Sequence, residues 1–304
     1  MKPLDASTRY CAVYGHPIAH SASPAMQNAG IAALELNWRY LAFDVHPTSL
    51  REAIAGAAAM KFIGLNLTVP HKLLALDIVD ELDVSASTWG AVNTVRFETK
   101  VGEEWLPLTQ VQSRETGEIR TRGYNTDADA ITRSLREDLN LELTGSSVLL
   151  LGAGGAGRTA ALKLADEGVG SLYLVNRTLS KAAELTTEIK QRFPGVKVQT
   201  GYPEGTDIDL VLNATSLGLK TGDALPLDLG LFALSRARYA YDMIYRPAET
   251  PFLQAAKAAG CRSANGVGML LYQGAKALEL WTGKPAPIEP MRAALLAHVY
   301  GTTH

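Results

Sequence analysis

Short apolar runs alternate with stretches of mixed character along most of the chain, which is the pattern of successive strands and helices. In the first part, apolar runs predict strands at 9–15, 40–45, 62–67 and 92–97. The stretches between them predict helices at 23–36, 49–60 and 73–82. Ser23 is expected to cap the first of these helices, with Pro24 at its first position. Such alternation indicates βαβ units and a largely parallel sheet, so we expect an α/β fold.

A second strand–helix series begins at residue 146. It predicts strands at 147–151, 171–175, 196–199, 209–213 and 238–242. Helices are predicted at 156–167 and 179–192, and further helices follow at 268–281 and 290–300. A helix predicted at 127–139 joins the two series, so we expect it to link two α/β domains.

The segment 98–122 interrupts this regularity. It is polar, contains Gly102 and Gly117, and has short β-like pieces such as the one that starts at Trp105. We interpret it as one or two hairpins laid on the surface of the first domain.

The stretch 64–72 carries the first candidate chemistry. Asn66, Thr68 and Lys72 come at the end of a predicted strand. Pro70 should end that strand, because its ring fixes φ and removes a backbone donor. Lys72 then opens a turn or a helix at the edge of the sheet where α/β proteins bind ligands. The alternative is that Lys72 is simply one solvated side chain among 29 lysines and arginines.

A glycine-rich turn marks a candidate cofactor site. The residues Gly152, Ala153, Gly154, Gly155, Ala156 and Gly157 follow a predicted apolar strand and open a predicted helix. Glycines in this context allow a tight turn and let the backbone approach a pyrophosphate at the helix N-terminus. The spacing alone is a weak signal, but the strand–turn–helix context is the one that dinucleotide binding requires. A turn with only a structural role is the alternative.

The end of the next strand indicates which dinucleotide binds. Sites for NAD usually place an acid there for the ribose 2′-hydroxyl. This chain instead has Asn176, Arg177 and Thr178, followed by Lys181. An acid would repel a 2′-phosphate, whereas an arginine can hold it with two hydrogen bonds. We therefore predict NADP(H), and the alternative is that Arg177 is only a surface arginine.

A third polar stretch, 213–218, follows another apolar strand. Its small polar residues Thr215 and Ser216 are expected to line the nicotinamide side of the crevice at the sheet edge. Taken alone, this signal is weak.

Composition narrows the class of protein. Of the 304 residues, 47% are apolar and 20% charged, as in globular proteins with a full core. A net charge of −2 gives no electrostatic reason to expect a nucleic acid or a membrane as partner. The chain has no apolar run of membrane-spanning length and no N-terminal signal pattern, so we expect a cytoplasmic protein. Cys11 and Cys261 have no metal-ligand spacing and fit a reducing compartment, with a single disulfide as the alternative.

Taken in order, these stretches resemble the shikimate dehydrogenase family. The resemblance covers nearly the whole chain and rests on residues 15–24, 66–72, 90–94, 123–127, 152–157, 176–178, 213–218, 242–247 and 266–273. It implies a discontinuous substrate-binding domain, residues 1–126 plus 267–304, with a mainly parallel sheet. It also implies an NADP-binding domain of the Rossmann type, with a doubly wound sheet, at residues 127–266.

The resemblance further implies NADP-dependent interconversion of 3-dehydroshikimate and shikimate, in the pathway to chorismate and aromatic amino acids. Lys72 and Asp127 would be the catalytic acid/base pair. Residues implied for the substrate are Ser21 and Ser23 at its carboxylate, Asn66, Thr68, Asn93 and Gln273 at ring hydroxyls, and Tyr245 beside it. Residues implied for the cofactor, besides the glycine turn, are Asn176, Arg177, Thr178, Lys181, Thr215, Ser216, Met243, Gly266 and Met269.

General chemistry also supports an acid/base role for Lys72 and Asp127, independently of the family resemblance. Reduction of a ketone builds negative charge on the carbonyl oxygen, and a positioned proton donor accelerates such a step roughly 10²–10⁴-fold. A carboxylate beside a lysine favours the charged ammonium, so Asp127 would mainly orient Lys72 and hold its charge. Which of the two carries the transferred proton stays open.

Other readings remain. One is a quinate/shikimate dehydrogenase with relaxed substrate or NAD use; the two serines, Ser21 and Ser23, argue mildly against it, since quinate needs room for one more hydroxyl. Another is a ligand-sensing homologue without turnover, which would not need both Lys72 and Asp127. For the oligomeric state we expect a monomer or a homodimer.

Two positions are notable against the family pattern. Gln27 stands where the family usually has a histidine, and we expect it to face the helix interior or the domain junction. His71 is at a variable position, and we favour a structural role over a substrate contact.

Overall fold

The computed structural model of the chain describes residues 3–111, 117–220 and 222–301. Residues 112–116, part of the segment interpreted as hairpins, lie outside the described residues. The chain forms two compact units: the first from residues 1–126 and 271–304, and the second from residues 127–270. The later division falls inside the helix α9 (Val267–Thr282), four residues beyond the boundary expected from the sequence.

The first unit is built on a mixed sheet with the strand order β2-β1-β3-β5-β7-β4, and β6 pairs with β5. Its strands are β1 (Arg9–Gly15), β2 (Trp38–Asp44), β3 (Gly64–Leu67), β4 (Glu81–Leu82), β5 (Thr94–Val101), β6 (Glu104–Pro107) and β7 (Ile119–Tyr124). Its helices are α1 (Ser23–Ala33), α2 (Leu50–Ala59), α3 (His71–Leu74), α4 (Val84–Trp89) and α10 (Ile288–Tyr300), with 3₁₀ turns at Pro47–Ser49 and Ala75–Asp77. The strands β2, β1 and β3 are parallel, as are β4 and β7, and the antiparallel pairings gather on β5.

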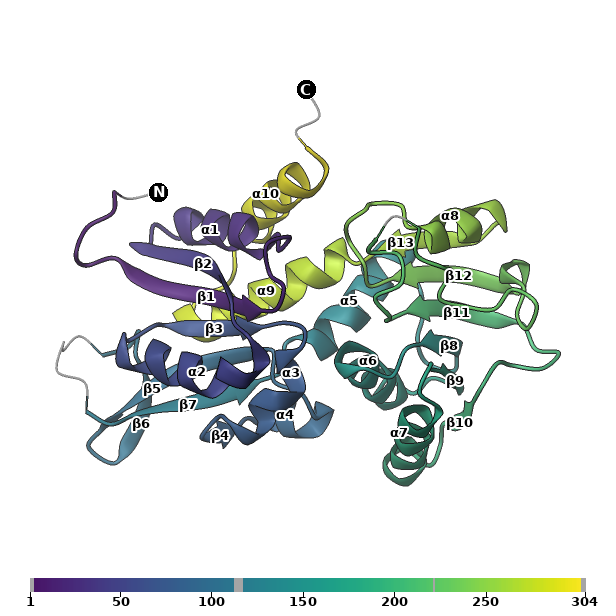
Figure 1. Cartoon of the computed structure of the whole chain (residues 1–304), viewed down its shortest axis with the longest axis horizontal. Coiled ribbons are helices and arrows are strands. Elements are labelled where there is room, and N and C mark those ends of the chain that lie inside the picture. The colour runs from purple at the N-terminus through teal and green to yellow at the C-terminus, as the bar shows by residue number, and fades with distance from the viewer. Residues whose placement is uncertain (1–2, 112–116, 221, 302–304) are drawn as a thin grey trace. The chain divides into compact units, whose positions relative to one another are not determined.

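Helices cover both faces of this sheet (Figure 1). On one face, Leu50, Ile54 and Ala57 of α2 pack with apolar residues of β1, β3 and β5 in one buried cluster. On the other face, α1 lies beside α10 and the end of α9. The side chain of Gln27 is fully buried there, and its Nε2 donates to the carbonyl of Gly274 at 2.8 Å. Gln27 therefore faces α9 within the first unit.

The prediction of a helix at 73–82 is wrong. The chain makes one turn of α3 and one 3₁₀ turn and then enters the short strand β4. The cause is a side-chain bond to a distant strand, because the Asp80 carboxylate accepts hydrogen bonds from the backbone N–H and the hydroxyl of Thr121 at 2.7 and 2.8 Å. These bonds hold the segment against β7 and end the helix.

The expectation of surface hairpins at 98–122 holds for β6, which forms an antiparallel hairpin with β5. It is wrong for β7, which lies between β5 and β4 inside the sheet. Glu98 on β5 is only 1% exposed and pairs with Arg96 and with Arg120 of β7. Charged residues that look solvent-facing in the sequence are thus neutralised across two neighbouring strands.

The predicted cap of the first helix is also wrong. The helix α1 starts at Ser23 itself, Ala22 occupies the N-cap position, and no side chain caps it. At this turn the backbone N–H of Ser23 donates to the Ser21 hydroxyl at 3.3 Å. Pro24 lies in the first turn, where its missing N–H costs no helical bond.

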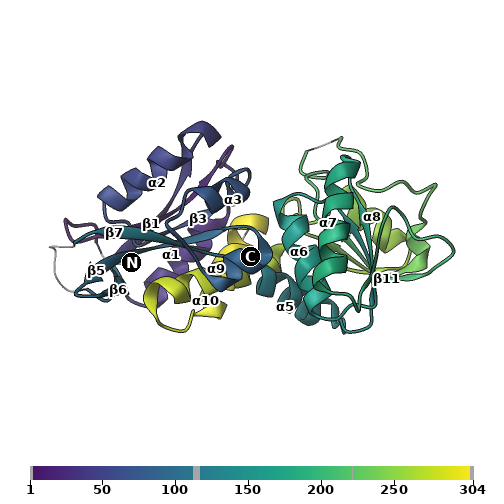
Figure 2. The same cartoon turned by 90° about the horizontal axis from the view of Figure 1, so that it is seen from below.

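The second unit is a parallel sheet with the strand order β10-β9-β8-β11-β12-β13. Its strands are β8 (Ser147–Leu151), β9 (Ser171–Val175), β10 (Lys197–Thr200), β11 (Ile208–Asn213), β12 (Ala237–Asp242) and β13 (Arg262–Asn265). Its helices are α5 (Asp127–Leu139), α6 (Gly155–Asp166), α7 (Leu179–Arg192), α8 (Pro251–Ala258) and the start of α9, with a 3₁₀ turn at Leu234–Arg236. Helices α6 and α7 lie on one face of this sheet and α8 on the other (Figure 2). No helix in the described ranges is long and apolar enough to cross a membrane.

Gly64 is required by close packing in the first unit. A Cβ added there would lie 2.1 Å from Nε1 of Trp281, a fully buried side chain that donates to the Val95 carbonyl at 3.1 Å. We expect Gly64→Ala to lower the unfolding free energy of this unit by about 1–3 kcal/mol, because the indole cannot move without losing its bond. Tryptophan fluorescence in urea measures this, since the tryptophans, at 38, 89, 105 and 281, all belong to this unit.

Gly56 of α2 provides the matched control. A Cβ added at Gly56 meets nothing within 4 Å, so Gly56→Ala should leave stability unchanged or raise it by up to about 1 kcal/mol. Equal effects of the two substitutions would contradict the packing argument.

Candidate active site

Within the first unit, polar side chains gather where β1 and β3 end. Ser21 and Ser23 follow β1, and the hydroxyl of Ser21 accepts from the backbone N–H of Ser23 at 3.3 Å. Asn66 lies on β3, and Thr68 and Lys72 follow it. Because carboxyl ends of parallel strands meet at one edge of a sheet, the fold brings these residues to a common edge.

The turn that carries Lys72 is fixed by its backbone. The N–H of Thr68 donates to the Tyr14 carbonyl at 3.0 Å, and that of His71 donates to the Thr68 carbonyl at 2.8 Å. The carbonyl of Lys72 itself accepts from Val92 N–H at 2.9 Å. Lys72 is half-buried on α3, so it is not the fully solvated lysine of the alternative reading.

His71 points away from solvent. Its side chain is fully buried, and burial lowers the pKa of the imidazole, which keeps it neutral over more of the pH range. This burial agrees with the structural role favoured for His71.

Asn66 and Asn93 belong to one buried hydrogen-bond network. The Oδ1 of Asn66 accepts from the Tyr40 hydroxyl at 2.7 Å, and its Nδ2 donates to the Thr94 hydroxyl at 3.0 Å and the Asn93 carbonyl at 3.3 Å. The side chain of Asn93 clamps Thr126: its Oδ1 accepts from the Thr126 N–H at 2.8 Å, and its Nδ2 donates to the Thr126 hydroxyl at 3.0 Å. The network thus reaches Thr126, one residue before Asp127.

Two of the sequence-predicted residues for substrate and catalysis belong to the second unit. Asp127 is the first residue of α5 and is 3% exposed, and Tyr245 follows β12 and is half-buried. Gln273 is in the first unit, half-buried on α9. Sequence reasoning gave no role to Tyr40 and Thr94, whose importance follows from contacts between distant strands.

The glycine turn in the second unit has the geometry of a dinucleotide site. Gly152 ends the strand β8 with φ of +106°, and a Cβ at Gly157 would lie 2.1 Å from the Gly152 carbonyl oxygen. Gly154 is exposed at the N-cap of α6, and a Cβ there meets nothing within 4 Å. The turn therefore presents bare backbone at the N-terminus of a twelve-residue helix, which suits a pyrophosphate.

The loop after β9 is tied to this turn. Asn176 Oδ1 accepts from the Ala153 N–H at 3.0 Å, and Asn176 Nδ2 donates to the Thr178 carbonyl at 2.8 Å. Arg177 and Lys181 are exposed beside it. Two cations without an intervening acid suit the extra phosphate of NADP rather than the free ribose of NAD.

A buried carboxyl organises the edge expected to face the nicotinamide. Asp242 is fully buried at the end of β12 and accepts from Asn213 Nδ2 at 3.0 Å, from the Thr250 hydroxyl at 2.6 Å and from the Ile244 N–H at 3.0 Å. Asn213 in turn accepts from the N–H and hydroxyl of Thr215 at 3.0 and 2.8 Å. Burial raises the pKa of Asp242 to about 6, although the hydrogen bonds oppose this rise.

Met243, the residue after this carboxyl, is one of the other cofactor candidates. A Cβ at Gly266 would be 2.1 Å from the Met243 carbonyl oxygen, so these two residues are in close backbone contact. Ser216 is exposed after Thr215, and Met269 is buried on α9. Asp242 is the last residue of the strand predicted at 238–242, but the sequence does not reveal that its side chain is buried.

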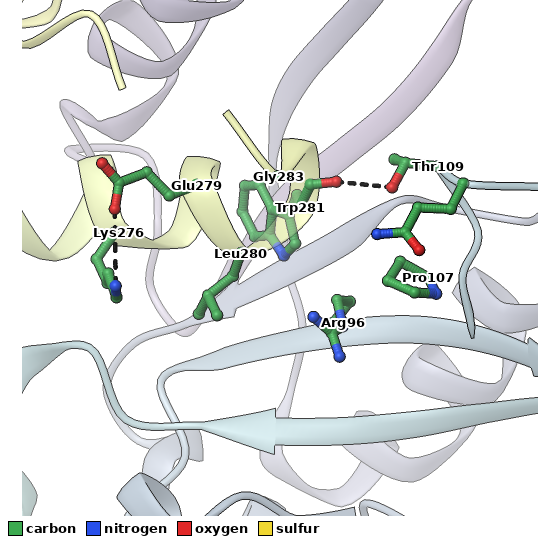
Figure 3. Close-up of a pocket in the computed structure, with 9 residues that line it drawn as sticks. Arg96, Pro107, Thr109, Lys276, Glu279, Leu280, Trp281 and Gly283 are labelled. Atoms are coloured by element: carbon green, nitrogen blue, oxygen red, sulfur yellow. Dashed lines mark hydrogen bonds and ion pairs between the residues drawn. The ribbon is translucent and has the colours of Figure 1, made fainter. Parts of the chain in front are cut away.

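One cavity of the first unit is lined by none of the candidate site residues. A cavity of about 200 Å³ lies between the end of α9 and the strand β5 (Figure 3). Its polar groups are largely paired: the Thr109 hydroxyl donates to the Trp281 carbonyl at 2.9 Å, and Lys276 lies 3.7 Å from Glu279. Among the described residues, no group of three or more His, Cys, Asp or Glu side chains is placed to hold a metal ion.

Comparison with known proteins gives a consistent result. Family profiles match at residues 13–95 (shikimate dehydrogenase substrate binding domain), 134–217 (shikimate / quinate 5-dehydrogenase) and 266–296 (shikimate 5′-dehydrogenase C-terminal domain). A curated NADP(+) shikimate dehydrogenase of Methanopyrus kandleri is 40% identical over 303 residues, covering 97% of this chain and 98% of the relative.

Solved structures agree. Shikimate 5-dehydrogenase of Thermus thermophilus, in complex with NADP(H) and shikimate, superposes with a TM-score of 0.77 at 35% identity, over 94% of this chain and 98% of that one. Quinate dehydrogenase of Corynebacterium glutamicum, in complex with NAD, superposes with a TM-score of 0.78 at 28% identity, over 95% of this chain and 99% of that one.

The doubly wound second unit with its glycine turn, joined to a separate α/β unit rich in buried amides, defines an oxidoreductase of the dinucleotide-dependent class. The matches above are spread over both units and nearly the full length. The chain belongs to the shikimate dehydrogenase family.

The raised pKa of Asp242 predicts a pH dependence of stability. The folded-state value, about 6, exceeds the ordinary 3.8, so the folded state binds the proton more tightly. The contribution is fully present below pH 4 and is lost as the pH rises to 6, about 3 kcal/mol at 1.36 kcal/mol per pH unit. Urea unfolding followed by circular dichroism from pH 4 to 6.5 measures this slope.

Asp242→Asn should remove the slope, because an amide does not titrate in this range. Asp207→Asn is the control, since that side chain is 86% exposed. A variant at position 242 that kept the slope of the parent protein would refute the assignment.

Proposed function

We propose that this protein catalyses the NADP-dependent, reversible reduction of 3-dehydroshikimate to shikimate, a step toward chorismate and the aromatic amino acids. The observation that carries the proposal is the hydrogen-bonded set of Asn66, Thr94 and Asn93 beside the Lys72 turn, in a chain whose second unit has a phosphate-type glycine turn. The similarity to proteins named NADP(+) shikimate dehydrogenase supports the same substrate and cofactor.

Lys72 and Asp127 are proposed as the acid/base pair. Reduction of the ketone develops negative charge on its oxygen, and a lysine ammonium next to that oxygen stabilises the charge and supplies a proton. The Asp127 carboxylate keeps the lysine charged and oriented. The cofactor, when bound, supplies the hydride.

The remaining residues hold the substrate. Ser21 and Ser23 at the N-terminus of α1 are proposed to bind the carboxylate, since hydroxyls there add to the positive end of the helix dipole. Asn66, Thr68, Asn93 and Gln273 are proposed to bind ring hydroxyls, and Tyr245 to lie beside the substrate. These groups match a small polyhydroxylated acid in both charge and hydrogen-bonding capacity.

The cofactor is proposed to lie along the carboxyl edge of the second sheet. Its pyrophosphate would be bound by residues 152–157 and its 2′-phosphate by Asn176, Arg177, Thr178 and Lys181. The nicotinamide side would be lined by Thr215, Ser216, Met243, Gly266 and Met269. The open backbone at Gly154 and the exposed cations support this assignment.

A second candidate is quinate/shikimate dehydrogenase activity with relaxed cofactor use. The similarity to a quinate dehydrogenase in complex with NAD favours it. The ratio of kcat/KM for quinate and shikimate, with each cofactor, separates the two. We also propose a cytoplasmic location, which suits the free and buried Cys11 and Cys261, and a monomer or homodimer.

Lys72→Ala tests the reaction. The purified protein should reduce NADP with shikimate, followed as NADPH absorbance, and the variant should lower kcat by roughly 10²–10⁴-fold with a much smaller change in KM. Lys100→Ala, at an exposed position on β5, is the matched control and should keep kcat. Absence of turnover by the parent protein would contradict the proposed function. An unchanged kcat in the Lys72→Ala variant would contradict the catalytic role of Lys72.

Arg177→Ala tests the cofactor assignment. Loss of a charged hydrogen bond to the 2′-phosphate should raise KM for NADP by roughly 10–100-fold, whereas KM for NAD should not rise. Arg238→Ala is the control, because that exposed arginine is near the opposite end of β12. If both variants treated the two cofactors alike, Arg177 would not be the selecting residue.

A further inference from the structure

The phenol of Tyr40 holds one of the proposed substrate-binding residues. Tyr40 is on β2, its side chain is fully buried, and its hydroxyl donates to Oδ1 of Asn66 at 2.7 Å. The two residues are 26 positions apart in the sequence, so only the pairing of strands in the sheet brings them together.

The hydrogen bonds around Tyr40 have a defined direction. An amide oxygen only accepts, so the Tyr40 hydroxyl donates its hydrogen to Asn66. The Nδ2 of Asn66 then donates to the Thr94 hydroxyl at 3.0 Å, and Thr94 donates to Asn93 Oδ1 at 3.2 Å. Burial keeps the pKa of Tyr40 well above its ordinary value, so the phenol remains a donor at every working pH.

This direction limits what Asn66 can offer a substrate. An amide nitrogen has two hydrogens, and those of Asn66 already point to Thr94 and to the Asn93 carbonyl. A carbonyl oxygen accepts two hydrogen bonds, and Oδ1 has one from Tyr40. The capacity left to Asn66 is that of an acceptor.

We infer that Tyr40 is a positioning residue: it fixes the amide of Asn66 with its oxygen as the only group offered, so that the substrate hydroxyl bound there must donate its hydrogen. The inference rests on the proposed function, because it concerns how that substrate is read. Tyr40 and the acceptor Thr94 hold Asn66 from its two ends. Without them, the amide can rotate by 180° and offer N–H groups instead.

Tyr40→Phe tests the inference, because it removes one oxygen and keeps the ring. An unpartnered buried acceptor should raise KM for shikimate by roughly 10-fold or more, with little change in kcat and none in KM for NADP. In an Asn66→Ala background, Tyr40→Phe should have no further effect on KM, since Tyr40 acts through Asn66. Tyr14→Phe is the matched control: it also removes a buried hydroxyl from this sheet, 3.5 Å from the Ala53 carbonyl, and should leave KM unchanged.

A second measurement does not depend on turnover. In protein with ¹⁵N-labelled asparagine, the side-chain NH₂ signals of Asn66 are identified by their loss in Asn66→Ala. We expect slow exchange of these hydrogens with water in the parent protein, faster exchange and shifted signals in Tyr40→Phe, and no change in Tyr14→Phe. If Tyr40→Phe does not fold, Thr94→Val should give the same rise in KM and Thr94→Ser should restore it.

The outcomes separate the two proposals. If the parent protein does not turn over shikimate, the proposed function is wrong. The exchange and the shifts of the Asn66 side-chain NH₂ signals then test the positioning role of Tyr40 without turnover. A parent protein with turnover, together with an unchanged KM and unchanged Asn66 signals in Tyr40→Phe, overturns the positioning role while the proposed function stands. Additive effects of the Tyr40 and Asn66 substitutions on KM would overturn it as well.

Discussion

The pairing of buried polar side chains is the constraint on which both proposed binding edges of this protein depend. In the first unit, amides and hydroxyls from β2, β3, β5 and the end of β7 satisfy one another in a water-poor interior. Such a network resists rearrangement, because breaking one bond leaves two unpaired groups in a low dielectric. It therefore gives the substrate side a rigid arrangement of donors and acceptors before any ligand binds.

In the second unit, a buried carboxyl is the hydrogen-bond partner of the neighbouring polar groups. Asp242 accepts hydrogen bonds from the end of β11 and from two residues of the loop between β12 and α8, so that the backbone around Met243 is held in place. The two units thus prepare their binding edges by different means: neutral amides where a polyhydroxylated acid is proposed to bind, and a buried acid behind the edge where the nicotinamide is proposed to lie. Both edges are carboxyl edges of strands, which is where parallel sheets leave room for ligands.

Local signals could be read from the sequence, and contacts between distant strands could not. The glycine turn was predictable because Gly152 and Gly157 meet over a few residues of one turn. The place of β7 was not, because it depends on pairing with β5 and on the charges that surround Glu98. Tyr40 was missed for the same reason: a tyrosine in an apolar strand gives no sign that its hydroxyl is bonded to Asn66.

The first unit is assembled from both ends of the sequence, as Trp281 covers Gly64 and Gly274 accepts from Gln27. During synthesis, the ribosome therefore completes the contiguous second unit before the last helices of the first become available. Until then, α1 alone covers one face of the first sheet, and the apolar surface that packs against α9 and α10 stays exposed. The unit that carries Lys72 is thus the one that cannot complete its core until the last helices have been translated.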